Sequence, residues 1–524
     1  MIFTSAKVGL YFELCKFFGR FFTIVFQSFE LIVKFVSENE NINHIIPYQM
    51  KKSLLILGAA FSFALPTLYA ASPVNNGGIS DADITAFRNA YEKTPANKAI
   101  HNAIASNGIT ALASNHANKA NFDNHFSHRV KSKGITNQRS SGRCWLFTGL
   151  NVLRAQMMRD HNLPKLELSQ NYNFFWDQLE KSNLFLQGII DTASLPDDDR
   201  KVDWLFSNAI SDGGQYTGVA DNLMKYGVVP IEVMPETHTS QSTSKLRSLM
   251  RLRLSEDGLE LRRMAASGAD AKALDARKKE MLTDVYRILA LNLGEPPTEF
   301  SWTRRDADGN AVSTETYTPQ SFYKAFAGND LKSDYVMLMN DPTREYYKLY
   351  EIEYDRHNYD GYNWTYVNLP ADEMKEMAIA SIKDNNAMYI SCDVNKFLDR
   401  DLGLLDVNNF DYDSLLGTKF GMNKADRIRT HSSASSHAMT LVAVDLDDNG
   451  KSKKWMVENS WGSGANDGHL VMTDDWFNEY MFRVVVNKKY ITPKVREVLK
   501  QNPTLLPPWD PMFAEDVDIV DFED

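Results

Sequence analysis

The stretch NQRSSGRCWLFTGLNVLRAQ, residues 137–156, joins a turn rich in serine and glycine to an amphipathic helix. We expect the helix to begin at Cys144, with an apolar face made of Leu146, Leu150, Leu153 and Met157. A thiol at a helix N-terminus is shifted toward the thiolate, because the helix dipole and unpaired N–H groups favour negative charge there. Cys144 is therefore a candidate nucleophile, although a buried core cysteine would give the same local pattern.

A second stretch, SSHAMTLVAVDLDDNGKSKKWMVENSWG, residues 435–462, predicts a β-hairpin with its turn at residues 447–450. Opposed residues of an antiparallel pair have a constant sum, and His437 and Asn459 centre on Asp448, inside that turn. We therefore expect the two side chains to lie opposite one another on one face. Asn459 would then accept the imidazole N–H and fix the tautomer and orientation of His437.

Other residues near these two stretches extend the candidate site. Trp461 is placed to shield the predicted hydrogen bond from water, and the rival imidazole, His431, precedes the strand and lacks an opposed partner. Gln138, six residues before Cys144, could return its side-chain amide across the loop as a donor to a developing oxyanion. A glutamine that only stabilises the loop is the alternative.

The segment Asp212-Gly213-Gly214-Gln215 places two glycines side by side. Their bare backbone could pair with an extended peptide as a short strand, and a plain turn explains the pattern equally well. We take Asp212, Gly213 and Gly214, together with Trp461, as candidate substrate-binding residues.

Composition restricts the classes of partner. The 524 residues are 43% hydrophobic and 24% charged, which is ordinary for a globular protein. The formal net charge of −11 and the dispersed basic residues argue against nucleic acid as a partner. The three cysteines, Cys15, Cys144 and Cys392, form no disulfide framework, and no Cys or Cys/His pairs have the spacing of zinc ligands. We expect no metal and no other cofactor.

The N-terminal region has the layout of an export signal. Met50-Lys51-Lys52 precedes an apolar run, residues 54–65, that ends near small residues at Ala70 and Ala71. We expect translation to start at Met50, with cleavage near Ala71 and export to a bacterial periplasm or the medium. The alternatives for this segment are a membrane anchor and a buried helix. If the segment is not an export signal, we expect a cytoplasmic protein. We expect no stable membrane insertion.

Periodicity separates helical from extended regions. Helical spacing runs from Asp81 to about Asn121 and from Ser240 to Leu293, where Gly258 and Gly268 indicate breaks between shorter helices. Near-alternating patterns predict strands at residues 347–369, 387–394 and 439–457.

Gln138, Cys144, His437 and Asn459 in this order, with CW after a glycine-containing turn and ENSWG at the end, resemble the papain superfamily of cysteine peptidases. Ser141 stands where that signature usually has its first cysteine, and the interval from Cys144 to His437 is long. Both features resemble the bleomycin hydrolase and aminopeptidase C branch. So do LSQNYNFFWDQLEKSN (168–183), DGGQ (212–215), KYGVVPIEVMPET (225–237), NDP (340–342), SCDV (391–394) and WDPM (509–512).

The resemblance implies an α+β, papain-like fold with a helical left domain, an antiparallel β right domain, a helical insertion and an N-terminal helical extension. It also implies a homohexamer and a C-terminal arm in the cleft. We divide the chain into a non-native or untranslated extension (1–49), a signal peptide (50–70), the helical extension (71–125), the left domain (126–239), the insertion (240–295), the β-rich domain (296–508) and the arm with an acidic tail (509–524).

The function that the resemblance implies is hydrolysis of peptide bonds through Cys144, His437 and Asn459, with Gln138 in the oxyanion hole. An aminopeptidase of broad specificity is expected, with peptides as substrates. The alternatives are an endopeptidase or oligopeptidase of the same fold, a transglutaminase-type acyltransferase, and an inactive peptide-binding homologue.

Overall fold

The computed structural model describes residues 77–119 and 123–515, which fall in two compact units, Met1–Ala99 and Ile100–Asp524. In the first unit, α3 (Asp81–Ala90) begins after Ser80, whose hydroxyl accepts from the Asp83 N–H while the Asp83 carboxylate accepts from the Ser80 N–H. The helix α4 (Pro95–Ile104) also begins there. The predicted extension at residues 1–49 and the signal at 50–70 lie outside the described residues.

The second unit contains many helices. They are α5 (Ile109–Ala113), α6 (His116–Lys119), α7 (Cys144–Asp160), α8 (Gln170–Asp191), α9 (Arg200–Ser207), α10 (Tyr216–Tyr226), α11 (His238–Gln241), α12 (Ser244–Ala266), α13 (Ala271–Leu293), α14 (Pro319–Phe326), α15 (Ala371–Lys383), α16 (Tyr412–Leu416), α17 (Lys424–Arg429), α18 (Ala465–Gly468), α19 (Asp474–Tyr480), α20 (Pro493–Val498) and the 3₁₀ turns η2 (Lys488–Tyr490) and η3 (Pro511–Phe513). Among the described residues, no helix combines the length and the apolar character needed to cross a bilayer.

The strands of the second unit are β1 (His128–Arg129), β2 (Phe300–Arg305), β3 (Ala311–Tyr317), β4 (Tyr335–Met339), β5 (Lys348–Ile352), β6 (Trp364–Asn368), β7 (Met388–Cys392), β8 (Leu398–Asp399), β9 (Leu404–Leu405), β10 (His437–Leu446), β11 (Ser452–Glu458), β12 (His469–Thr473), β13 (Met481–Asn487) and β14 (Thr504–Leu506). The region 347–369 thus forms two strands, β5 and β6.

One large sheet organises the second unit. Its strand order is β14-β5-β6-β4-β13-β7-β10-β11-β12-β9-β8, with β1 paired to β10, and β2 and β3 form a separate hairpin. Most pairs are antiparallel, and β4–β6, β9–β12 and β5–β14 are parallel. The central strands β7 and β10 are almost entirely buried, and α7 packs against β10. The fold is α+β, as expected.

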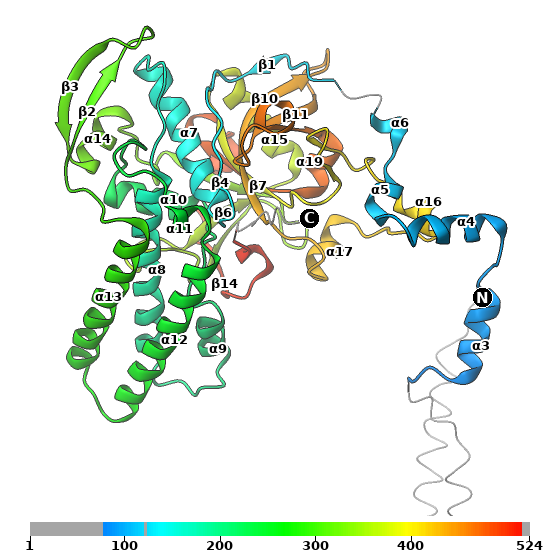
Figure 1. Ribbon diagram of the computed structural model, residues 1–524, viewed down its shortest axis with the longest axis horizontal. Helices are drawn as coiled ribbons and strands as arrows, with labels where there is room; N and C mark the ends of the chain where they lie inside the picture. The colour runs from blue at the N-terminus through cyan, green and yellow to red at the C-terminus, as the bar shows by residue number, and fades with distance from the viewer. Residues whose placement is uncertain (1–76, 120–122, 516–524) are drawn as a thin grey trace, which may run out of the picture. The chain divides into compact units, whose positions relative to one another are not determined.

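The long helices α12 and α13 form the helical region predicted at residues 240–293, and they lie side by side with α8 (Figure 1). The predicted break at Gly258 is wrong, because Gly258 lies inside the continuous helix α12. A Cβ there would lie 3.0 Å from Phe206 Cε1 and 3.1 Å from Phe185 Cζ, so this glycine allows close packing. Gly268 does separate the two helices, with a φ of 87° that favours glycine.

The predicted hairpin is present as β10 and β11, and its turn lies at residues 447–450, as expected. The predicted register is wrong: Thr440 pairs with Glu458, and Leu441 with Val457. His437 is therefore not directly opposite Asn459. A β-bulge between Leu441 and Ala443 shifts the register further along the strand.

Candidate active site

Cys144 is the first residue of α7 and is fully buried. The first backbone N–H groups of a helix point toward its N-terminus, and here the preceding residue, Arg143, makes no side-chain cap to them. Trp145 is also buried, and its Nε1 donates to the Asp212 backbone oxygen at 2.8 Å. This bond ties the start of α7 to the candidate substrate segment.

His437 begins β10, and its side chain contacts Asn459 despite the shifted register. His437 Nε2 donates to Asn459 Oδ1 at 2.8 Å, and the Ser460 N–H donates to the same oxygen at 2.8 Å. Two donors to Oδ1 fix the orientation of the Asn459 amide, which in turn fixes His437 in the Nε2–H form or the imidazolium. The structure therefore contains the hydrogen bond expected between these two side chains.

Trp461 lies over this hydrogen bond, as expected. Its ring centroid is 4.9 Å from that of His437, and the Arg400 guanidinium carbon lies 4.9 Å from the Trp461 ring. The rival His431 is exposed in the turn after α17, away from the buried strand. The structure thus brings His437, Asn459 and Trp461 together and leaves His431 outside.

Gln138 is buried and held by two segments of the site. Its Oε1 accepts from Ser460 Oγ at 2.6 Å and its backbone N–H donates to the Ser460 oxygen at 2.8 Å. Its Nε2 donates to the Ser141 backbone oxygen at 2.9 Å, within the loop that leads to Cys144. Ser460, which sequence reasoning missed, thus links Gln138 to the residue after Asn459.

The three candidate substrate-binding residues of the glycine segment, Asp212, Gly213 and Gly214, have different surroundings. The Asp212 carboxylate is buried and accepts from Thr243 Oγ1, with Arg247 3.7 Å away. The Gly213 N–H donates to Ser211 Oγ at 2.9 Å. A Cβ at Gly214 would lie 2.4 Å from His357 Cε1 and 2.7 Å from Trp145 Cδ2, so only glycine fits there.

A buried charged cluster that sequence reasoning missed lies beneath this segment. Lys181 Nζ donates to the backbone oxygens of Ser211 and Gly213 and lies 3.2 Å from Asp177 Oδ2. His357 Nδ1 lies 2.6 Å from Asp177 Oδ1. Burial raises the pKa of Asp177, but the Lys181 and His357 charges and hydrogen bonds outweigh burial and hold this pKa below its ordinary value.

Only part of that cluster is predictable from the sequence. Asp177 and Lys181 are four residues apart on α8, which is the spacing of an ion pair along one helix face. Nothing in the pattern around His357 indicates that it contacts a helix so distant in the chain.

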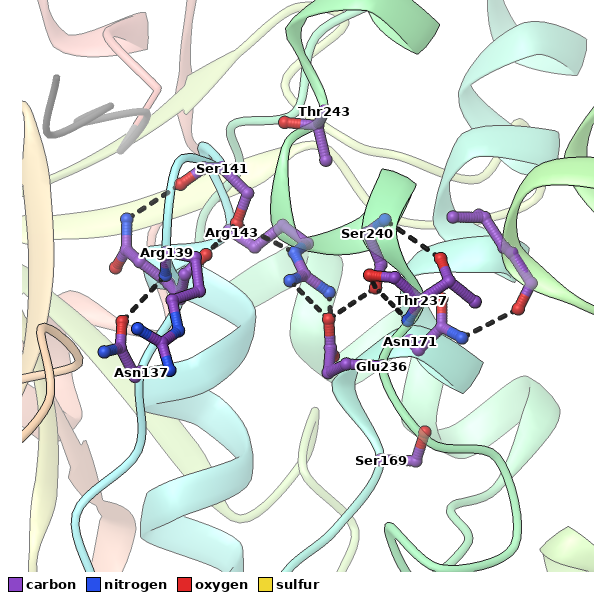
Figure 2. A network of polar contacts seen from close by, with 12 residues as sticks. Asn137, Arg139, Ser141, Arg143, Ser169, Asn171, Glu236, Thr237, Ser240 and Thr243 are labelled. Carbon is purple, nitrogen blue, oxygen red and sulfur yellow. Dashed lines mark hydrogen bonds and ion pairs between the residues drawn. The ribbon is translucent and has the colours of Figure 1, made fainter.

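A second ion pair joins Arg143, which is fully buried and directly precedes the nucleophile, to the half-buried Glu236. Figure 2 shows the Arg143 guanidinium facing the Glu236 carboxylate. Arg143 Nη1 and Nη2 donate to the two carboxylate oxygens at 3.0 and 2.8 Å. Burial raises the pKa of Glu236, but Arg143 and the hydroxyl of Ser240 outweigh burial, and the pKa lies below its ordinary value. Glu236 therefore stays ionised next to its partner.

The described part of the C-terminal arm is anchored in the same region. Arg483 Nη2 donates to the backbone oxygens of Met512 and Ala514, each at 2.8 Å. Gln215 Nε2 donates to the Phe513 oxygen at 3.0 Å. A cavity of about 610 Å³ is lined by residues of the arm and by Lys181 and other basic side chains, including Arg247, Arg251 and Arg356.

Comparison with known proteins identifies the family. The model of the Peptidase C1-like family matches residues 78–513. The chain belongs to this family. Aminopeptidase C of Lactobacillus delbrueckii subsp. lactis is 38% identical over 442 residues, which cover 83% of this chain and 98% of that protein. Bleomycin hydrolase of Mus musculus is 37% identical over 452 residues, which cover 84% and 99%.

A solved structure extends the comparison to the fold. The crystal structure of PepW from Lactobacillus rhamnosis aligns with a TM-score of 0.81 at 39% identity, and covers 84% of this chain and 99% of that one. This Peptidase C1-like chain is a cysteine peptidase of the aminopeptidase C and bleomycin hydrolase type, with the expected papain-like α+β fold.

Proposed function

We propose that this peptidase hydrolyses peptide bonds by acyl transfer through Cys144, assisted by His437, Asn459 and Gln138. The observation that carries the proposal is the 2.8 Å hydrogen bond from His437 Nε2 to Asn459 Oδ1. Because Nε2 donates to Asn459, Nδ1 is the ring nitrogen that exchanges a proton with the Cys144 thiol. The packing of α7 against β10, whose first residues are Cys144 and His437, supports this pairing.

The reaction proceeds in two steps. The Cys144 thiolate attacks the scissile carbonyl carbon, and the oxygen of that carbonyl becomes an oxyanion that accepts from the Cys144 N–H and from Gln138 Nε2–H. The C–N bond then breaks, and His437 gives its Nδ1 proton to the leaving amine. A water molecule attacks the thioester while His437 takes one of its protons, and the acid product leaves as the thiolate is restored.

We propose further that the chain is an aminopeptidase of broad specificity. The arm around Phe513 and Ala514 hydrogen-bonds to Gln215, directly after the candidate substrate glycines. An arm in this place leaves room for few substrate residues before the scissile bond. Carboxylates of the acidic tail can pair with a free α-amino group, and they are Glu515, Asp516, Asp518, Asp521, Glu523 and Asp524.

Truncation after Pro508 tests the aminopeptidase proposal. We expect the truncated enzyme to cleave N-acetylated peptides faster and to lose preference for free N-termini, measured as the ratio of blocked to unblocked turnover. A matched variant that ends at Glu515 keeps the anchored arm and removes only the rest of the tail, so it separates the two contributions. The same ratio in all three enzymes would refute a role for this segment and favour an endopeptidase or oligopeptidase.

The assembly and the cellular location are also proposals. We propose a homohexamer, whose closed ring would shelter the sites from folded substrates. Light scattering at micromolar concentration tests this, and a monomer would contradict it. We propose export, with the mature chain starting near Ala71, which N-terminal sequencing of protein from the native host tests. Peptides from residues 1–49 in the mature protein would overturn this second proposal.

A further inference from the structure

The loop from Gln138 to Cys144 closes on itself through reciprocal hydrogen bonds. Gln138 Nε2 donates to the Ser141 oxygen at 2.9 Å, and Ser141 Oγ donates to the Gln138 oxygen at 2.6 Å. Both side chains are fully buried. Ser141 therefore sets the distance between the Gln138 amide and the backbone of the residues that lead into α7.

Arg143, the last residue of this loop before Cys144, joins it to Glu236. Its Nε donates to Ser141 Oγ at 3.0 Å, while both terminal nitrogens donate to Glu236, and its exposed fraction is 0%. The guanidinium carbon also lies 5.1 Å from the Phe147 ring and 5.3 Å from the Phe174 ring. A guanidinium has donors in a fixed planar fork, so the position of Glu236 determines the position of Ser141.

Glu236 in turn is fixed by the start of the helical insertion. Ser240 Oγ donates to Glu236 Oε2 at 2.6 Å, and Ser240 also forms the capping box of α11 with Thr237. Figure 2 shows the network in sequence, from Ser141 through Arg143 and Glu236 to Ser240. The path links the insertion to the loop before the nucleophile.

We propose that Arg143 and Glu236 are positioning residues that align the oxyanion donors, Gln138 Nε2 and the Cys144 N–H. The proposal rests on the proposed function. The Glu236 charge cancels that of Arg143, so the pair adds little net charge beside the thiol and its role is geometric. Oxyanion stabilisation depends steeply on donor placement, and a displacement of about 1 Å can cost about a hundredfold in rate.

Two variants break the path at different points. Ser141→Ala keeps the ion pair and removes the hydroxyl that joins Arg143 to the Gln138 oxygen, while Glu236→Gln removes the charge that holds Arg143. Ser381→Ala is the matched control, because Ser381 is equally buried, donates one hydrogen bond to the Asn386 oxygen, and lies on α15 outside the network. The readouts are kcat and KM on an unblocked aminoacyl nitroanilide, the rate of Cys144 alkylation by iodoacetamide, and thermal unfolding.

We expect Ser141→Ala and Glu236→Gln to lower kcat by about tenfold or more, with KM changed by less than about twofold. Alkylation should not slow, because it needs the thiolate and no oxyanion donor. If kcat in folded Ser141→Ala equals that of Ser381→Ala, or if hydrolysis and alkylation fall equally, the proposal is wrong. Ser141→Ala decides the outcome if Glu236→Gln does not fold. If the parent enzyme does not hydrolyse the substrate, the proposed function is wrong instead.

Discussion

On the helical side of the site, Cys144 and the Gly213–Gly214 segment lie beside buried charges, whereas on the sheet side His437 and Asn459 lie within or beside a backbone ladder. The helical side uses Arg143–Glu236 and the Lys181 cluster to hold irregular loops. The sheet side holds its residues through strand pairing, since β10 is bonded to β7, β11 and β1.

The difference follows from the backbone. A loop has few backbone partners of its own, and its buried carbonyl groups need side-chain donors, which the ammonium of Lys181 supplies to Ser211 and Gly213. A central strand satisfies its backbone in the ladder, so its side chains can be apolar or catalytic. Loss of a charged side chain should therefore disturb the geometry of the site most on the helical side. Loss of a side chain that takes part in the chemistry should lower kcat on either side.

The largest effect should come from the nucleophile. We expect Cys144→Ala and Cys144→Ser to lower kcat by about 10⁴-fold or more with the fold intact, because thiolate attack is the only covalent route in the proposed reaction. Hydrolysis of an unblocked aminoacyl nitroanilide measures the loss, and the unfolding temperature measures the fold. Full activity in either variant would remove Cys144 from the mechanism.

On the sheet side, His437→Ala should lower kcat by about 10³-fold, and Asn459→Ala by about ten- to a hundredfold. Proton transfer is the larger contribution, and Asn459 only orients the ring. The same assay in parallel measures both variants, with His431→Ala as the control imidazole because it is exposed and outside the site. A larger loss at Asn459 than at His437 would reverse the assigned roles.

Sequence reasoning identified the residues of the site better than their spatial relations. The hairpin turn at 447–450 was predictable, because turn chemistry is a local property. The His437–Asn459 contact was expected from a register that the structure does not have, although the two side chains do meet. The register was not predictable, since the pairing of Thr440 with Glu458 and the bulge after Leu441 depend on packing against both neighbouring strands.

The ion pairs that join separate elements were not predictable from the sequence either. Arg143 and Glu236 lie on separate elements, and so do Asp177 and His357, so periodicity within one element carries no information about them. Arg143 did depart from the small residue usual in papain-like signatures, which is the signal that could have prompted a search for a buried acid. Gly258 was misread as a break because the close approach of Phe185 and Phe206 is a tertiary feature.

One ion pair joins the two sides and should be sensitive to single substitution. Arg154 on α7 donates to Glu458 Oε1 at 2.7 Å, and both side chains are buried, with exposed fractions of 3% and 2%. Arg154→Met leaves an uncompensated buried carboxylate beside Asn459 and should cost about 3 kcal/mol in the free energy of unfolding. Arg154→Met/Glu458→Met should recover most of that loss. Denaturant unfolding measures both, and equal losses in the single and double variants would contradict the pairing.

The smallest effect concerns Lys424, a buried lysine at the start of α17. Lys424 donates to Asn340 Oδ1 at 2.7 Å and to two backbone oxygens, and burial lowers its pKa from 10.5 to about 7. Between those values the unfolded chain binds one more proton than the folded chain, so this group makes stability rise with pH.

Lys424→Met should remove that rise in the free energy of unfolding, which amounts to about 1 kcal/mol per pH unit between about pH 7.5 and about pH 9. This loss of pH dependence is separate from any stability that the substitution costs at neutral pH. The measurement is the unfolding temperature against pH, restricted to this window because buried tyrosines with raised pKa, such as Tyr323, act in the opposite direction near pH 10. Lys279→Met is the control, since 72% of that side chain is exposed. If Lys424→Met and Lys279→Met show the same slope as the parent, the ammonium of Lys424 keeps its proton in the folded protein. The hydrogen bonds to its three oxygen acceptors would then outweigh its burial.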